Sequence, residues 1–151
     1  MIETFEMGDL PIRSHDAVER FFDNLPEDKY ADSGYRFRRF SKFLFNEYGD
    51  LVMDQDETFT QSSDINKAFG DVERKFEPIE RGLLKTAGFA QMFQHFYNKT
   101  GIHSGIGCHM VRIAVGPDGV PAAPEGPHHD GFDYIGAVSY THLTLPTNRE
   151  V

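Results

Sequence analysis

Hydrophobic residues recur at helical spacing in two stretches of the chain. The first stretch, Val18 to Leu25, predicts a short helix that ends at Pro26. The second begins after Pro78, and Gly101 is placed to end it. Its apolar positions are Leu83, Leu84, Ala87, Ala90, Phe93, Phe96 and Tyr97. A helix with this much aromatic surface on one side is expected to pack across a sheet.

Alternation of apolar and polar side chains predicts strands on either side of the second helix. Residues 35–38 alternate aromatic and basic side chains, which predicts a strand, and the alternation slips at residues 39–40, which allows a bulge or a bend there. Residues 46–50 are typical of a hairpin turn, with the chain returning through residues 51–53. Residues 109–115 then form a strand of period two. The expected organisation is a first two-thirds that favours helix and a remainder that favours strand.

Composition and charge are typical of a soluble single-domain protein. The 151 residues suit one domain, and 39% hydrophobic with 26% charged residues is the mix of a globular fold. A net charge of −9 argues against a nucleic-acid surface. The sequence has neither an apolar run that could span a membrane nor the pattern of a signal peptide. We therefore expect a cytoplasmic protein with small-molecule partners. The single cysteine, Cys108, is expected to be a small buried hydrophobe rather than a nucleophile.

A candidate metal motif lies in the run Gly126-Pro127-His128-His129-Asp130-Gly131. The run is typical of the start of a strand, where alternate side chains share a face. His128 and Asp130 are therefore expected to project together, while His129 points away. A mononuclear non-haem iron site uses two histidines and one carboxylate on one side of the metal. The motif predicts two of these three ligands.

Other polar residues allow more than one interpretation. Arg36, Arg38 and Arg39 would either bind a substrate carboxylate in bidentate fashion or form a solvated strand face paired with the many acidic residues of the chain. His109 is expected to be a histidine packed on the neighbouring strand rather than a ligand.

Three segments of the chain resemble segments of a known protein family and follow one another in the same order as in that family. They are Tyr35 to Phe43, parts of Gln61 to Pro78, and His109 to Ile113 followed by Pro124 to Gly131. The last segment carries the pattern Glu-Gly-x-His-x-Asp-Gly. With these segments, which cover about residues 30–137, the chain resembles the bacterial 2-oxoglutarate- and iron(II)-dependent dioxygenases that hydroxylate free amino acids. L-isoleucine dioxygenase belongs to that group.

The resemblance implies an α+β fold. It would be a double-stranded β-helix, a jelly-roll or cupin-like barrel, with flanking N-terminal helices. It also implies Fe(II) bound by His128 and Asp130, with 2-oxoglutarate as co-substrate and a free amino acid as substrate. As a hypothesis about roles, either Arg112 or one of Arg36, Arg38 and Arg39 would bind the carboxylate of that substrate.

The chain differs from the family pattern after Asp130. In the family, a third iron ligand (a histidine) and a basic residue that binds 2-oxoglutarate follow on later strands. We expect neither of them in the 21 residues that follow Asp130. His142 is too close to Asp130 in sequence to be the third iron ligand. Residues 138–151 resemble a translated sequencing adapter. The expectation is that residues 1–137 are the N-terminal part of a dioxygenase domain with an incomplete barrel, inactive as given, and that residues 138–151 are a non-native tail.

Two other functions stay open. A cupin-like zinc or manganese enzyme would use His109, His128 and Asp130 without 2-oxoglutarate. A non-catalytic β-domain would act as a binding module without a metal. The ordered likeness of the three segments favours the dioxygenase.

Overall fold

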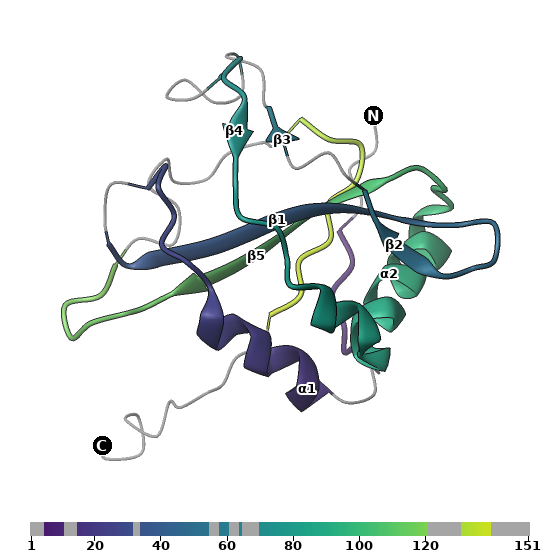
Figure 1. Ribbon diagram of the computed structural model, residues 1–151, viewed down its shortest axis with the longest axis horizontal. Helices are drawn as coiled ribbons and strands as arrows, with labels where there is room; N and C mark the ends of the chain where they lie inside the picture. The colour runs from purple at the N-terminus through teal and green to yellow at the C-terminus, as the bar shows by residue number, and fades with distance from the viewer. Residues whose placement is uncertain are drawn as a thin grey trace.

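The computed structural model describes residues 5–10, 15–31, 34–54, 58–60, 64, 70–120 and 131–139. A three-stranded antiparallel sheet has the order β2-β1-β5, and a two-stranded sheet pairs β3 with β4. The strands are β1 (Arg36–Phe45), β2 (Leu51–Met53), β3 (Thr58–Phe59), β4 (Arg74–Lys75) and β5 (Ile106–Ile113). Helices lie on one side of the larger sheet, and the β3–β4 pair lies on the other (Figure 1). The fold is thus a mixed one of helices and open antiparallel sheet.

β1 and β5 pair without a break, from Arg36 opposite Ile113 to Phe43 opposite Ile106. The strand therefore has no bulge at residues 39–40, although the slip in the alternation allowed one. Arg39 keeps the alternation because its guanidinium donates to the main-chain oxygens of Pro78, at 3.0 Å, and Asn24, at 3.1 Å. A polar side chain that finds acceptors in this way can occupy the helix-covered side of a strand without breaking the pairing.

The predicted hairpin between β1 and β2 is confirmed. The side-chain oxygen of Asn46 accepts hydrogen bonds from the main-chain N–H groups of Tyr48, at 3.0 Å, and Asp50, at 2.9 Å. Gly49 adopts a φ of +82°, which a residue with a side chain rarely does. Asparagine and glycine at these positions therefore close the turn that sets the register of β2.

The first predicted helix is confirmed in position, but only its first part is α-helical. It consists of α1 (His15–Glu19) followed by the 3₁₀ helix η1 (Arg20–Asn24). Val18 and Leu25 of the predicted apolar stripe are buried in the core. The last carbonyl oxygens of η1 have no partner within the helix, as at any helix end, and arginine side chains of the sheet donate to them.

The second predicted helix is divided in two. The 3₁₀ helix η2 (Arg81–Lys85) is followed by α2 (Ala87–Thr100), and Thr86 between them is extended, with ψ 132°. Both the N–H and the hydroxyl of Thr86 donate to the carbonyl oxygen of Leu83, which ends η2. Gly101 ends α2 in the left-handed conformation, as predicted, with φ 71°.

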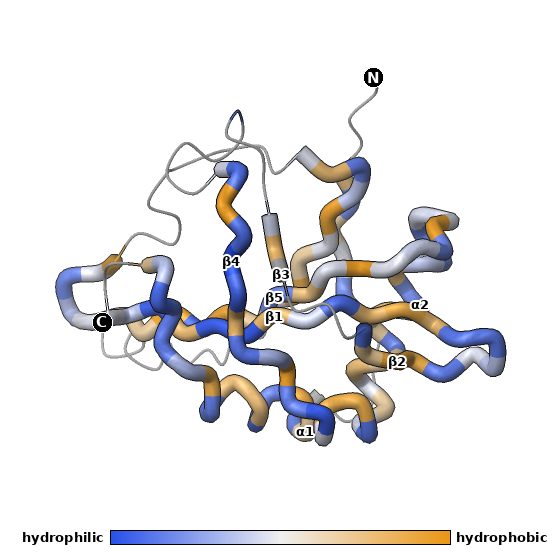
Figure 2. The backbone as a smooth tube through the Cα atoms, turned by 45° about the horizontal axis from the view of Figure 1, so that its top comes forward, coloured by the Kyte–Doolittle hydropathy of each residue, from blue (hydrophilic) through white to orange (hydrophobic). Residues whose placement is uncertain are grey.

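The main core lies between β1, β5 and the helices. Phe43 of β1 is fully buried, and its ring centroid lies 5.2 Å from that of Phe89 and 5.1 Å from that of Phe93, both on α2. The prediction that this helix packs across a sheet is therefore confirmed. Figure 2 shows short hydrophobic and hydrophilic stretches alternating along the sheet and the helices that cover it.

Candidate functional site

The predicted iron ligands lie outside the described residues. His128 and Asp130, with His129 between them, belong to the stretch 121–130, of which the structure gives no description. The chain is described again from Gly131. The ring centroid of Phe132 lies 6.3 Å from that of Phe59 on β3. The residues that directly follow the motif therefore lie on the side of the sheet that carries β3 and β4.

That side of the sheet presents the alternate residues of β1 and β5. Residues paired across antiparallel strands point to the same side. Phe40 is opposite His109, and Arg36 and Arg38 share their side. Phe59, Arg74 and Phe76 pack over these residues. We call this set the arginine face, and it comprises Arg36, Arg38, Phe40, Phe59, Arg74, Phe76 and His109.

Asp28 is the acidic partner of the arginine face. Its side chain is buried, and its Oδ2 lies 3.5 Å from Nε of Arg36 and 3.6 Å from Nη1 of Arg38. Residues 26–28 run beside the start of β1, because Arg38 N–H donates to Pro26 and Asp28 N–H donates to the carbonyl oxygen of Arg36, both at 2.8 Å. Sequence reasoning missed Asp28, since no spacing or motif relates it to β1.

Arg36 and Arg38 are paired with an acid, as one interpretation of the sequence expected, but they are not solvated. Their side chains are 21% and 10% exposed. The guanidinium of Arg38 stacks over the ring of Phe76, at 4.3 Å from the centroid. Burial lowers the pKa of Arg38 to about 10, although the carboxylate of Asp28 opposes that shift. Arg38 is still a cation at neutral pH.

His109 is a packed histidine, as predicted. Its ring centroid lies 4.4 Å from that of Phe40 and 4.6 Å from that of Phe59. Its Nδ1 lies 2.8 Å from Nη2 and 3.2 Å from Nε of Arg38. Burial, reinforced by the neighbouring arginines, lowers the pKa of His109 to about 2. The imidazole is therefore neutral at physiological pH.

Arg39 and Arg112 lie on the opposite side of the sheet. Arg112 donates to the main-chain oxygens of Phe22, at 2.9 Å, and Asp23, at 3.1 Å, and stacks over the ring of Phe37. The structure therefore does not bring the four candidate arginines together. The reason is the period of two along a strand, which puts Arg39 and Arg112 on the helix-covered side.

The described residues do not by themselves form a metal site. Within the described ranges, no group of three His, Cys, Asp or Glu side chains could hold a metal ion. Apart from the single imidazole of His109, the arginine face offers guanidinium groups and phenyl rings, which are not metal ligands. Cys108 packs against the core, and burial raises the pKa of its thiol to about 12, so it is no thiolate ligand at neutral pH. A complete set of iron ligands would therefore have to include residues outside the described ranges.

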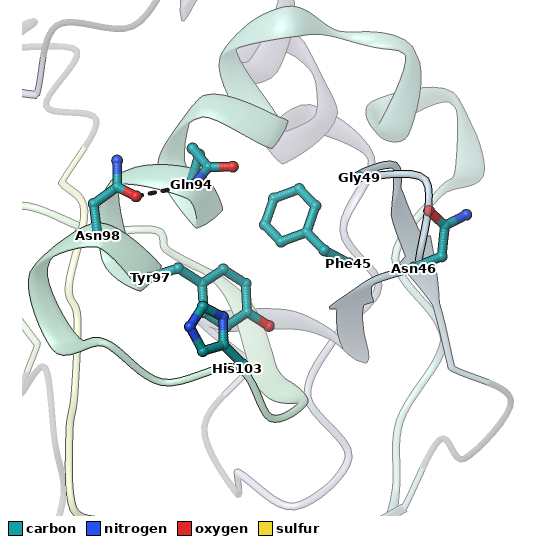
Figure 3. Close-up of a pocket in the computed structure, with 7 residues that line it drawn as sticks. All are labelled: Phe45, Asn46, Gly49, Gln94, Tyr97, Asn98 and His103. Atoms are coloured by element: carbon teal, nitrogen blue, oxygen red, sulfur yellow. Dashed lines mark hydrogen bonds between the residues drawn. The ribbon is translucent and has the colours of Figure 1, made fainter.

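A cavity of about 270 Å³ lies at the other end of β1, by the hairpin turn (Figure 3). The residues that line it are Phe45, Asn46, Gly49, Gln94, Tyr97, Asn98 and His103. Several of the polar side chains that line it already form hydrogen bonds within the protein. The amide of Gln94 donates to Asn98, and the amide oxygen of Asn46 closes the turn. This cavity contains none of the candidate metal-binding or substrate-binding residues predicted from the sequence.

The described chain also shows no helix that is long and apolar enough to cross a membrane.

Comparison with known proteins identifies the family. The sequence profile described as 2OG-Fe dioxygenase matches residues 19–142. No curated protein matches the chain. A crystal structure of a bsmA homologue from Methylobium petroleophilum PM1 is 26% identical in sequence and superposes with a TM-score of 0.59, over 78% of this chain and 50% of that one. The chain thus spans half the length of that protein. Because the profile matches most of its residues, the chain belongs to the 2OG-Fe dioxygenase family, which implies Fe(II) and the co-substrate 2-oxoglutarate.

Proposed function

We propose that this chain is part of an Fe(II)- and 2-oxoglutarate-dependent oxygenase that hydroxylates a free amino acid or a similar small molecule, as in the L-isoleucine dioxygenase group. His128 and Asp130 are two of its three iron ligands. The match to the 2OG-Fe dioxygenase profile supports the oxygenase, and the observation that supports the place of its site is the contact of Phe132 with Phe59. Since Phe132 comes two residues after Asp130, this contact supports a metal site beside the arginine face.

The arginine face has the properties that such a site needs. Phe40, Phe59 and Phe76 form an apolar wall that would exclude water from the reacting carbon. Arg36 and Arg38 supply positive charge on the same face, where the carboxylate of an amino acid would bind. Fe(II) with 2-oxoglutarate, when bound, would supply the activation of dioxygen. The part of these residues is to orient the substrate and to keep water out.

The proposal also includes the fold of the complete domain. We infer that β1, β2 and β5 belong to a double-stranded β-helix whose remaining strands come from residues outside those described. The open sheet, with helices covering one face and an aromatic and cationic surface on the other, supports this interpretation. Residues 1–137 would be the N-terminal part of that domain. The interpretation of residues 138–151 as a non-native tail stays a prediction, since residues 140–151 lie outside the described residues.

Iron binding by the motif tests the ligand assignment. We would measure Fe(II) binding by anaerobic equilibrium dialysis of the chain and of the variants His128→Ala, Asp130→Ala and His129→Ala. The first two are expected to weaken binding at least about tenfold, because each removes a ligand. His129→Ala is the matched control, and we expect it to bind like the unsubstituted chain. Equal affinity in all four proteins would refute the assignment.

Turnover tests the remaining claim, that the 151 residues alone are inactive. We propose this because only two of the three expected iron ligands have counterparts in them, and two ligands bind iron weakly. The measurement is succinate formation from 2-oxoglutarate, followed by mass spectrometry, in the presence of Fe(II), ascorbate and a mixture of the free amino acids. Succinate formed together with a hydroxylated amino acid would overturn the claim of inactivity.

A further inference from the structure

The contact between Arg38 and His109 decides which imidazole nitrogen carries the proton. A guanidinium has donors but no acceptor. Both Nη2 and Nε of Arg38 are within hydrogen-bond distance of Nδ1 of His109, at 2.8 and 3.2 Å. Nδ1 must therefore be the acceptor, and the proton of the neutral ring is on Nε2.

The surroundings of His109 keep the ring neutral and its orientation constant. The ring of Phe40 lies against it, and the rings of Phe59 and Phe76 meet it edge-on, at interplanar angles of 87° and 88°. Arg38 is held in turn by Asp28 and by the ring of Phe76. An imidazolium here would lie in an apolar environment beside a guanidinium, which is unfavourable.

The Nε2–H group of His109 contacts no acceptor among the residues that the structure describes. The nearby charged groups on this face are Arg36, Arg38 and Arg74, with Asp28 engaged by two of them. A fixed donor beside several guanidinium groups is complementary to an anion. A carboxylate suits the position because one of its oxygens can accept from a neutral N–H while the other faces a cation.

We propose that Nε2–H of His109 donates a hydrogen bond to a carboxylate of a small molecule bound on the arginine face, and that Arg38 is a positioning residue that holds the imidazole in this tautomer. The proposal rests on the proposed function and makes it more specific, because it assigns a ligand contact to His109 and an indirect role to Arg38. The carboxylate belongs either to the amino-acid substrate or to 2-oxoglutarate. The two sources share the same chemistry.

The first experiment observes the tautomer directly. Long-range ¹H–¹⁵N correlation spectra of the ¹⁵N-labelled chain distinguish the two neutral tautomers and the imidazolium, and a His109→Phe variant assigns the signals. We expect the Nε2–H form for His109 at neutral pH. In Arg38→Met, which keeps the bulk of the side chain but removes its donors, we expect a mixture of tautomers. A purely Nδ1–H ring or an imidazolium in the unsubstituted chain would overturn the proposal.

The second experiment follows the Nε2–H signal during titration without metal. The probes are L-isoleucine and 2-oxoglutarate, and the controls are L-isoleucinamide and the dimethyl ester of 2-oxoglutarate. We expect one carboxylate probe to shift the signal while its control does not, which also identifies the source of the carboxylate. His109→Phe should weaken binding of that probe about tenfold, and Arg38→Met about threefold. The proposal would be refuted if no probe shifts the Nε2–H signal, or if a carboxylate probe and its amide or ester control shift it equally.

Circular dichroism of each variant establishes that it is folded before its binding is interpreted. Should His109→Phe not fold, the Arg38→Met comparison still tests the proposal, because that variant keeps the imidazole. Neither experiment uses a metal. A negative result in these experiments would therefore not affect the iron-binding test of His128 and Asp130. A negative result in the iron-binding test would likewise leave the tautomer measurement interpretable.

Discussion

The ring of Phe132 lies against the ring of Phe59, with 6.3 Å between their centroids and 39° between their planes. Four residues later the chain meets α2, because a Cβ added at Gly136 would lie 2.9 Å from Cδ2 of Phe96. The stretch 131–139 is thus in contact with both β3 and α2. The chain that follows the His-x-Asp motif is positioned by two contacts of the described fold.

The contact of Phe132 with Phe59 should be measurable as a coupling free energy. In a double-mutant cycle of Phe59→Leu and Phe132→Leu we expect about 0.5 kcal/mol, the usual size for an aromatic pair with an exposed member. The measurement is the free energy of unfolding in urea. Tyr134, which is 51% exposed against 52% for Phe132, provides the control. A cycle of Phe59→Leu with Tyr134→Leu should show no coupling, and equal coupling in both cycles would contradict the contact.

Arg112 should contribute to stability more than to ligand binding. Arg112→Lys keeps the charge but loses the geometry that reaches the carbonyl oxygens of Phe22 and Asp23, so we expect about 1–2 kcal/mol of destabilisation. The exposed Arg81 is the control, and Arg81→Lys should change stability by less than about 0.5 kcal/mol. Unchanged stability with weakened binding of the carboxylate probe would instead favour Arg112 as a substrate ligand.

Gly107 of β5 should be required for the packing of Phe40. A Cβ at this position would lie 3.1 Å from Cε2 and 3.3 Å from Cζ of the Phe40 ring. That ring is almost completely buried and has little room to move. We therefore expect Gly107→Ala to destabilise the chain by about 1–3 kcal/mol. Gly105→Ala is the matched control, since its Cβ would meet the carbonyl oxygen of Phe43 at an ordinary 3.6 Å. Equal unfolding free energies for the two variants would contradict this packing.

His109 should make the chain less stable in acid. In the folded chain its pKa is lowered to about 2, whereas in the unfolded chain it takes up a proton near its ordinary value of 6.5. Between these values the unfolded state binds more protons, so the free energy of unfolding falls as the pH is lowered, by up to about 1.4 kcal/mol per pH unit. Urea unfolding at about pH 7.5 and about pH 5 measures this change.

The variant His109→Gln isolates the contribution of the imidazole from that of the acidic residues. Its loss of stability between the two pH values should be smaller than that of the unsubstituted chain. An identical loss in His109→Gln would show that the imidazole is not buried in its neutral form.

Much of the local structure follows from short-range chemistry. The hairpin at Asn46 and Gly49, the helix end at Gly101 and the apolar stripe at Val18 and Leu25 were all predicted correctly. In each case the cause lies within a few residues, in a positive φ, a side chain that bonds to its own turn, or a repeat of apolar positions. The His-x-Asp motif is local in the same sense, and it stays a prediction because its residues lie outside those described.

The arrangement of the arginine face depends on contacts between residues far apart in the chain. Asp28 meets Arg36 and Arg38 because residues 26–28 run beside β1, and His109 meets Arg38 across a strand pair that joins residues 71 positions apart. The continuous strand through Arg39 likewise depends on carbonyl acceptors at Asn24 and Pro78. Periodicity tells which residues share a side, but not which distant groups will satisfy a buried charge. That is decided only when the sheet and its covering segments pack together, because the free energy of a buried polar group depends on its partners.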